Sequence, residues 1–265
     1  MHGAVEQVER ISPAMVRVVL GGDGLDGFEM VPFTDAYVNL LFVPPRAPYA
    51  VPFDLAQARA LDRDAWPVPR RFSVRAWDEA TRRLTIDFVV HGDEGTAGRW
   101  AQRARPGDLL QLAGPSGAYR PDPAAAWHLL VGDESALPAI AASVEALEPD
   151  AEAVVVLLVD GPDHELALGG PVGVDVVWLH RETLAGTAEE ALVAAVAAIA
   201  RPFDGVRAFV HGEAVETRAV RRHLLGERAV PRDALSVSPY WRRTMTDERW
   251  REVKRDWLAE VERDT

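Results

Sequence analysis

The segment WHLLVGDESALPA, residues 127–139, decides the fold of the second half of the chain. An apolar run over 127–131 reaches a glycine, the triplet Asp-Glu-Ser follows at 133–135, and a helical stretch runs from Ala136 to Leu147. A buried strand that turns into a helix in this way is the repeating unit of a parallel α/β sheet. Ligands bind such sheets at the carboxyl ends of the strands. The Gly-x-Gly-x-x-Gly fingerprint is absent, so the triplet either caps the helix or shapes a ligand site of another kind.

The same alternation of strand and helix continues to the end of the chain. Short, fully apolar runs are typical of strands that are buried on both faces of a parallel sheet. Stretches with apolar residues at helical spacing follow them. The sequence predicts strands over Ala153–Val159, Val174–Leu179 and Val206–Val210, and helices over Ala188–Ala200, Ala214–Leu225 and Thr246–Arg263.

The first 118 residues have a different pattern. Short apolar runs are separated by Gly and Pro, which indicates an antiparallel barrel or sandwich. The proline-rich segment Pro44–Pro69 is expected to form an irregular loop. The predicted strands are Met15–Leu20, Tyr37–Val43, Phe72–Trp77, Leu84–Val90 and Asp108–Leu112.

The predicted fold class is therefore an N-terminal antiparallel β-barrel followed by a C-terminal parallel α/β nucleotide-binding domain. The boundary falls near Ser116–Pro123, which gives domains of 1–118 and 119–265. In this recurrent pairing the barrel holds a flavin and the α/β part presents a nicotinamide dinucleotide to it. That expectation is fold-level analogy, so particular residues have to support it.

Composition excludes several classes of protein. The 265 residues include no Cys, which rules out disulfides, Cys-ligated zinc, iron–sulfur clusters and thiol nucleophiles. Redox chemistry would therefore need a bound cofactor. A net charge of −12 makes nucleic acid an unfavourable partner. The longest uncharged apolar run, Ala191–Ala200, is too short to span a membrane, and the N-terminus lacks a signal-peptide core, so we expect a soluble cytoplasmic protein. The seven His residues show no ligand spacing, so we expect no structural metal.

Two motifs in the first half are suited to an anionic, ring-containing ligand. Arg70-Arg71-Phe72-Ser73-Val74-Arg75 places Arg forks, which suit a pyrophosphate, beside a hydroxyl that can hydrogen-bond a ring nitrogen. The segment His91–Trp100 follows a predicted strand, and a helix is expected to begin within it near Thr96. Free backbone N–H groups at the start of a helix bind phosphate. The alternatives are a strand with solvated Arg side chains and a plain β-to-α turn.

Three further segments lie at predicted turns or strand ends. Ala113–Gly117 is not a serine-hydrolase elbow, because Gly117 follows Ser116 directly, and it is interpreted as an interdomain turn. Glu213 follows a predicted strand at the start of a helix. In Pro239–Arg243, adjacent aromatic residues followed by Arg suit either stacking on a planar ring or packing in the core.

Taken in order along the chain, these segments resemble the siderophore-interacting protein family, the flavin-dependent ferric-siderophore reductases. The resemblance covers nearly the whole chain, and the stretch Gly132–Ala139 is its most specific part. Departures from the family pattern are Phe72 for Tyr, Ser73 for Thr, Thr96 and Gly98 for Pro and Ser, and Pro239 for Gly. The matching residues are Arg70, Ser73, Arg75, His91, Gly92, Gly95, Ala97, Trp100, Gly107, Asp108, Gly114, Gly117, Gly132–Ala139, Gly212, Glu213 and Tyr240–Arg242.

The resemblance implies FAD on the barrel. Arg70 and Arg75 would hold the diphosphate region, Phe72 would lie against the flavin, and Ser73 would hydrogen-bond the ring near N5 as a catalytic candidate. The remaining cofactor-binding residues implied on this side are His91, Gly95, Thr96, Ala97, Gly98 and Gly114.

The resemblance also implies NAD(P)H on the α/β domain. Asp133, Glu134 and Ser135 would shape the nicotinamide side, with the two acids as catalytic candidates. Glu213 belongs to the implied cofactor set, and Tyr240 and Trp241 would cover the other face of the flavin. Ferric siderophores are often anionic, so Arg46, Arg242 and Arg243 are candidate substrate contacts or else ordinary surface residues.

The implied reaction moves a hydride from NAD(P)H to the flavin and then single electrons to Fe(III) held by a siderophore. One alternative is a flavin reductase that uses another substrate or takes electrons from ferredoxin. Another is a siderophore-binding protein without flavin. The choice between NADH and NADPH is not readable, although Arg181, after a predicted strand, is positioned to meet a 2′-phosphate. We expect a monomer.

Overall fold

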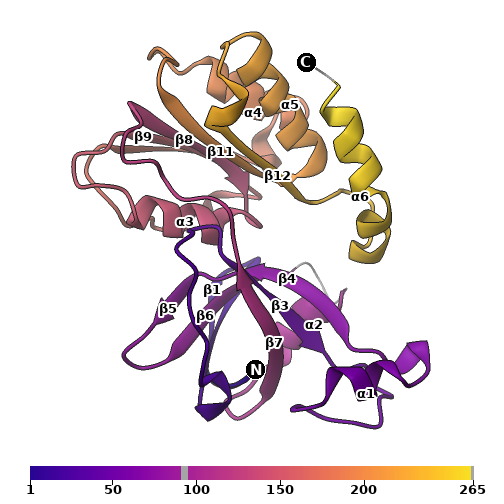
Figure 1. Cartoon of the computed structure of the whole chain (residues 1–265). Coiled ribbons are helices and arrows are strands. Elements are labelled where there is room, and N and C mark those ends of the chain that lie inside the picture. Colours follow the sequence, from indigo (N-terminus) through magenta and orange to yellow (C-terminus); the bar gives the residue numbers. More distant parts are fainter. Residues whose placement is uncertain (91–94, 264–265) are drawn as a thin grey trace. The chain divides into compact units, whose positions relative to one another are not determined.

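The computed structural model describes residues 1–90 and 95–263. The chain divides into two compact units, Met1–Arg120 and Pro121–Thr265. The first contains an antiparallel sheet of seven strands and the second a parallel sheet of five strands (Figure 1). The predicted succession of an antiparallel β part and a parallel α/β part is confirmed.

The strands of the first unit curve around a single apolar core. Inward-facing positions such as Val18, Leu40 and Ile86 are completely buried and alternate with more exposed residues, as expected for a sheet with one solvated face. The strands are β1 (His2–Ser12), β2 (Met15–Gly21), β3 (Tyr37–Phe42), β4 (Val68–Ser73), β5 (Ala76–Asp78), β6 (Arg83–Val89) and β7 (Leu109–Ser116), in the spatial order β4-β3-β7-β1-β2-β6-β5.

The hydrogen-bond ladder of this sheet stays open between its outer strands β4 and β5 within residues 1–90 and 95–120. The single strand predicted over Phe72–Trp77 is wrong in this respect, because the chain breaks between these two strands. The amide of Val74 donates to the carbonyl of Ala36 at 2.7 Å, and the amide of Arg75 donates to the carbonyl of Thr85 at 2.9 Å. Val74 is thus bonded to the residue before β3 and Arg75 to a residue of β6, so the chain crosses from one end of the open sheet to the other between them.

Two other features of this unit were not predicted. The N-terminal residues form β1, the longest strand of the sheet, which pairs with β2 and β7. The proline-rich segment expected to be irregular contains the short helix α1 (Leu55–Arg59), which begins where the Asp54 carboxylate accepts the Gln57 amide at 2.8 Å.

An aromatic cluster attaches the helix α2 (Thr96–Arg103) to the sheet. The ring of Trp100 lies 5.8 Å from that of Phe42 and 5.7 Å from that of Phe88. On its other side, Phe88 packs against Phe72 of β4 with ring centroids 4.5 Å apart. The cluster therefore links α2 to β4, the strand that carries part of the Arg-rich motif.

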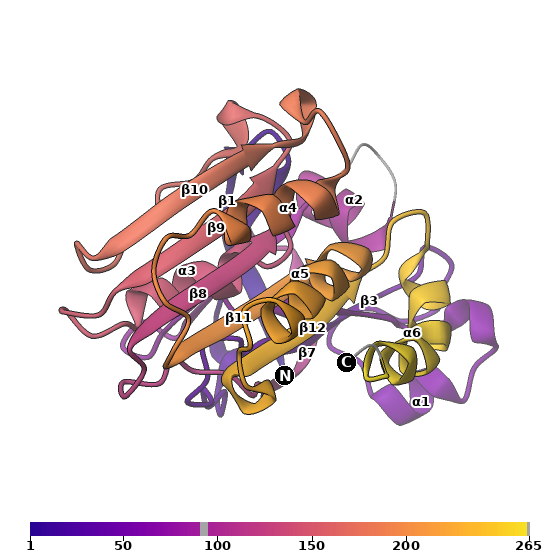
Figure 2. The same ribbon diagram turned by 90° about the horizontal axis from the view of Figure 1, so that it is seen from above.

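The second unit is a three-layer α/β arrangement. Helix α3 covers one face of the sheet, and α4 and α5 cover the other (Figures 1 and 2). All residues of β8 and β9 are buried, which explains their unbroken apolar sequences. Its elements are β8 (Trp127–Asp133), α3 (Leu137–Glu145), β9 (Ala153–Val159), β10 (Val174–His180), α4 (Ala188–Ala197), β11 (Val206–Glu213), α5 (Ala214–Gly226), β12 (Leu235–Trp241) and α6 (Asp247–Val261), with the strands in the order β10-β9-β8-β11-β12.

The C-terminal helix α6 packs against the start of α5, as its helical spacing of apolar residues predicted. Thr246 caps it by accepting the amide of Arg249. Trp250, Trp257 and Val261 form a buried cluster with Ala214. None of the helices in the described part of the chain is long and apolar enough to cross a membrane.

We predict that Phe88→Ala destabilises the first unit by about 3–5 kcal/mol, because it removes the ring that joins Phe72 to Trp100 inside the core. Urea unfolding followed by fluorescence would measure this loss. The control Val172→Ser changes a fully exposed side chain and should shift the free energy of unfolding by less than about 0.5 kcal/mol. Equal stabilities for the two variants would contradict the role given to the aromatic cluster.

Candidate functional site

The strand order places a topological switch point between β8 and β11. From β8 the chain proceeds through β9 to β10 at one edge, whereas β11 is followed by β12 at the other edge. The connections therefore diverge at the carboxyl ends of the two central strands, which is where open α/β sheets bind their ligands. The ends of these strands carry Asp133 and Glu213, and Glu134 and Ser135 follow β8 directly.

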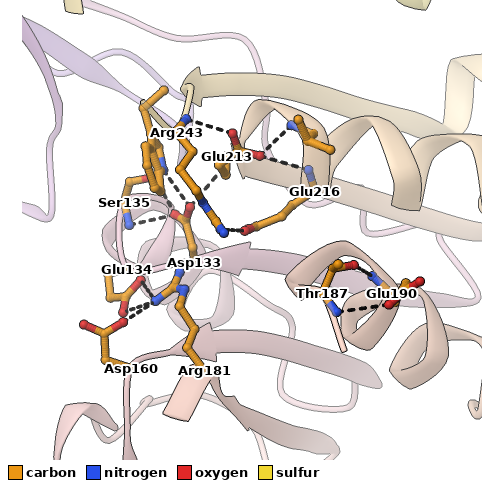
Figure 3. Close-up of polar contacts among 12 residues, drawn as sticks. Asp133, Glu134, Ser135, Asp160, Arg181, Thr187, Glu190, Glu213, Glu216 and Arg243 are labelled. Atoms are coloured by element: carbon orange, nitrogen blue, oxygen red, sulfur yellow. Dashed lines mark hydrogen bonds and ion pairs between the residues drawn. The ribbon is translucent and has the colours of Figure 1, made fainter. Parts of the chain in front are cut away.

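The carboxylate of Asp133 joins the ends of these strands. It is almost completely buried, and its Oδ1 accepts the amide of Ser135 at 2.8 Å, the Ser135 hydroxyl at 2.5 Å and the amide of Ala136 at 3.3 Å. Its Oδ2 accepts the amide of Glu213 at 3.0 Å and the Trp241 indole N–H at 2.7 Å. One side chain thus fixes the end of β8, the start of α3, the end of β11 and the end of β12 (Figure 3).

Gly212 makes this arrangement sterically possible. Its φ of 139° lies in the region that favours glycine, and a Cβ here would stand 2.9 Å from the Asp133 carboxyl carbon. A larger residue would push the carboxylate out of the crevice between β8 and β11.

Glu134 forms a buried ion pair with Arg181. The Arg181 Nη1 donates to both Glu134 oxygens, at 2.6 and 2.8 Å, and to Asp160 Oδ1 at 3.0 Å (Figure 3). Burial raises the pKa of Glu134, although Arg181 acts in the opposite direction. Burial alone would lower the pKa of Arg181, but the contact with Glu134 outweighs it and the pKa is raised. The guanidinium of Arg181 is therefore charged and donates hydrogen bonds to two acids, Glu134 and Asp160.

The same region contains three potential metal ligands. Atoms of Glu134, Asp160 and His164 lie within 4.8 Å of one another. Because Arg181 donates to both carboxylates, their charge already has a counter-ion, and we assign no metal to this group.

Glu213 and Glu216 hold the segment that follows β12. Glu213 Oε2 caps α5 by accepting the amides of Val215 and Glu216, and its Oε1 accepts the amide of Arg243 at 2.9 Å. The Arg243 side chain donates to Glu216 Oε1 at 2.7 Å (Figure 3). Burial raises the pKa of Glu216 to about 8, helped by the nearby charge of Asp133. Arg243 is half exposed, so solvent screens its opposing attraction.

His211 on β11 orients Tyr240 on β12. Its Nδ1 lies 3.0 Å from the Tyr240 hydroxyl and its Nε2 lies 3.0 Å from the Ser236 hydroxyl. Burial and the positive charge of Lys254 lower the pKa of His211 to about 3, so its ring is neutral. This role of His211 could not be predicted from the sequence, because it depends on the pairing of β11 with β12.

In the first unit, successive side chains of the Arg-rich motif on β4 point to opposite faces of the sheet. Phe72 pairs with Val38 and Arg70 with Leu40, both inward-facing residues of β3, whereas Ser73 pairs with Tyr37 on the opposite face. Phe72 stays partly exposed at this outer strand while it packs on Phe88.

The start of α2 has the features of an anion site. Gly95 is its N-cap with φ 76°, no side chain caps the helix, and a Cβ on Gly95 would meet no atom within 4 Å. The N–H groups of the first turn, from Thr96 through Gly98, therefore have no side-chain acceptor from the cap. The aromatic cluster connects α2, the helix that this turn begins, to β4 through Trp100, Phe88 and Phe72.

The remaining predicted residues are dispersed. Gly114 lies in β7 with φ 118°, a backbone conformation that favours glycine, and a Cβ there would approach the Tyr37 carbonyl to 3.3 Å. The geometry of the sheet therefore explains this glycine without a ligand. Arg46 is exposed after β3, and Arg242 is partly buried after β12. His91 falls outside the described residues.

Comparison with known proteins covers both units. The family model described as a siderophore-interacting FAD-binding domain matches residues 4–119, and the model described as siderophore-interacting protein matches residues 125–244. The chain is 33% identical to the ferric vibriobactin reductase ViuB of Vibrio cholerae, over 92% of this chain and 90% of that protein. It is 32% identical to an NADPH-dependent ferric-chelate reductase of Escherichia coli, over 89% and 91%.

Solved structures give the same result. The siderophore-interacting protein SipS from Aeromonas hydrophila superposes with a TM-score of 0.80 at 29% identity, and the match covers 98% of each chain. Sequence and fold therefore agree over nearly the whole chain.

We predict that Glu216 lowers stability as the pH rises. The folded protein keeps the Glu216 proton up to about pH 8, whereas the ordinary pKa in the unfolded chain is 4.5. Between these values the folded state binds more protons, so the free energy of unfolding falls with rising pH. In Glu216→Gln this fall is absent, so urea titrations across the window should show the variant gaining stability relative to the parent. The control Glu148→Gln, at an exposed position, should run parallel to the parent; parallel curves for Glu216→Gln would contradict the prediction.

Proposed function

Because this chain belongs to the siderophore-interacting protein family, we propose that it is a ferric-siderophore reductase that uses FAD and a nicotinamide dinucleotide. The observation that carries the proposal is the match of two successive family models, the first to an FAD-binding domain, over nearly the whole chain. Relatives named as ferric vibriobactin reductase and ferric-chelate reductase, matched over about nine-tenths of the chain, support the iron half of the reaction.

The residues of the first unit fit FAD. Arg70 and Arg75 supply positive charge for the diphosphate, and the uncapped first turn of α2 supplies N–H donors with open space at Gly95. When bound, FAD would accept a hydride from the dinucleotide and return electrons one at a time.

Around the ring system, we assign separate roles to two neighbouring residues. Phe72 offers its partly exposed ring as a packing surface, and Phe88 and Trp100 behind it keep that ring in place. Ser73 offers a hydroxyl for a ring nitrogen from the opposite face of the strand.

In the second unit, the carboxyl ends of β8 and β11 are the proposed site for the dinucleotide. Asp133 acts as a positioning residue here, because all five of its donors are protein groups. Glu134 and Ser135 form the rim of the site. We retain Tyr240 and Trp241 as stacking partners for the flavin, with their polar atoms held by His211 and Asp133.

The substrate proposed is Fe(III) in a hard, oxygen-donor chelate. Such ligands hold Fe(III) far better than Fe(II), so one-electron reduction loosens the metal without any acid or nucleophile from the protein. Arg46, Arg242 and Arg243 are the proposed contacts to an anionic siderophore. Arg243 is held by Glu213 through its amide and by Glu216 through its guanidinium.

The function is tested with purified protein, FAD and a ferric catecholate siderophore. A flavin spectrum should persist through gel filtration, and Fe(II) trapped by a chromogenic chelator should accumulate when NADH or NADPH is added. If Fe(II) accumulated with reduced ferredoxin but not with NADH or NADPH, the electron donor would be ferredoxin and the proposed dinucleotide site would be wrong. Protein that takes up no FAD would contradict the reductase and favour a siderophore-binding protein.

We further predict that Phe72→Tyr tightens FAD binding about two- to tenfold, because the added hydroxyl restores one hydrogen bond to the cofactor. Fluorescence titration of the apoprotein with FAD measures the change in Kd. Phe53→Tyr, which adds the same hydroxyl beside Tyr49 and away from this motif, is the control and should leave Kd unchanged. An unchanged or weaker Kd in Phe72→Tyr would remove Phe72 from the flavin site.

A further inference from the structure

Two residues of opposite charge stand where a dinucleotide-binding sheet recognises the adenosine ribose. Asp160 directly follows β9, the second strand of the unit β8–α3–β9, and Arg181 directly follows β10 beside it. At such positions an acid hydrogen-bonds the ribose 2′-hydroxyl of NADH, whereas a nearby Arg accommodates the 2′-phosphate of NADPH. The contacts of these two side chains decide which chemistry this chain provides.

Arg181 has little capacity left for a phosphate. Its Nη1 is shared between Glu134 and Asp160. Its Nη2 has no hydrogen-bond partner among the described residues, but it is buried from solvent, so a phosphate could reach it only if the side chain left its place beside Glu134. The Glu134 side chain is only 4% exposed. A 2′-phosphate that drew Arg181 away would leave this buried carboxylate without its counter-ion, which is strongly unfavourable.

Asp160, in contrast, is available to a ligand. Its side chain is 51% exposed, and Arg181 contacts one oxygen, Oδ1, which orients the carboxylate. A ribose hydroxyl can donate to such a group, whereas a phosphate dianion would be repelled by it. Three more acids, Asp163, Glu165 and Glu182, lie in the segments that follow β9 and β10. They increase the negative charge near the carboxyl ends of β9 and β10.

We propose that Glu134 and Asp160 hold Arg181 as an internal counter-ion, so that the site selects NADH over NADPH. This inference rests on the proposed function, because it specifies the electron donor of the same site. It reverses the expectation that Arg181 receives a 2′-phosphate. Repulsion between like charges predicts a kcat/KM for NADH at least about tenfold above that for NADPH.

The test separates binding from turnover. Calorimetry on the full FAD-loaded chain compares AMP with 2′-phospho-AMP, and steady-state assays compare NADH with NADPH. The parent should bind AMP more tightly. In the double variant Glu134→Gln/Asp160→Asn, Arg181 is released and the preference should shift toward the 2′-phosphate by about tenfold or more in both assays.

Two further variants keep the test interpretable. Asp160→Asn alone, at a half-exposed position, should shift the ratio in the same direction by a smaller factor if the double variant does not fold. Glu165→Gln removes an acid that follows β9 and contacts His180, and it should shift the ratio by a smaller factor than Asp160→Asn does. If Glu165→Gln shifted the ratio as much as Asp160→Asn does, the preference would come from the total negative charge near the site. That result would overturn the role proposed for the pairing of Arg181 with Glu134 and Asp160.

A parent protein that prefers NADPH or binds 2′-phospho-AMP more tightly than AMP would overturn the inference and leave the reductase function intact. If neither dinucleotide reduced the bound flavin, the inference would also fall. In that case, photoreduced protein mixed with a ferric siderophore would report separately on the iron half of the proposed function.

Discussion

The carboxylate of Asp133 is the constraint on which the second unit depends. Five protein donors from three segments converge on this one buried group, and each would lose its acceptor without it. The glycines on either side are part of the same requirement. A Cβ on Gly132 would come within 2.8 Å of the His211 carbonyl, and one on Gly212 would meet Asp133 itself. The close approach of β8 and β11 therefore requires Gly, Asp and Gly at these positions.

This arrangement has an electrostatic consequence for function. Acids dominate the strand ends of the second unit, and two of the Arg side chains among them, Arg181 and Arg243, are paired with Glu134 and Glu216. The first unit has the opposite character around its Arg-rich strand and uncapped helix start. A cofactor diphosphate is thus expected on the first unit. The second unit favours a donor that adds as little negative charge as possible.

The sequence was most informative where burial on both faces left an unbroken apolar run. Ala153–Val159 was predicted with the observed bounds for this reason. It failed at β12, whose residues LSVSPYW are partly buried at the sheet edge and lack a clear period. The ion pair of Arg181 with Glu134 could not be predicted either, because it joins residues that are distant in sequence and meet only when β10 and β8 flank β9. The ordered motifs identified the family, while the contacts of Asp133, His211 and Glu216 required the fold.

The central claim is that one protein both accepts electrons from a dinucleotide and delivers them to chelated Fe(III). Anaerobic rapid mixing tests it most directly: the FAD-loaded chain is first bleached with one equivalent of donor and then mixed with a ferric siderophore. The account predicts that flavin absorbance returns and that about two ferrous ions appear for each flavin, since a hydride carries two electrons. Absorbance that stays low with the ferric siderophore and returns only on admission of oxygen would contradict it, and would leave a flavin reductase whose substrate is not iron.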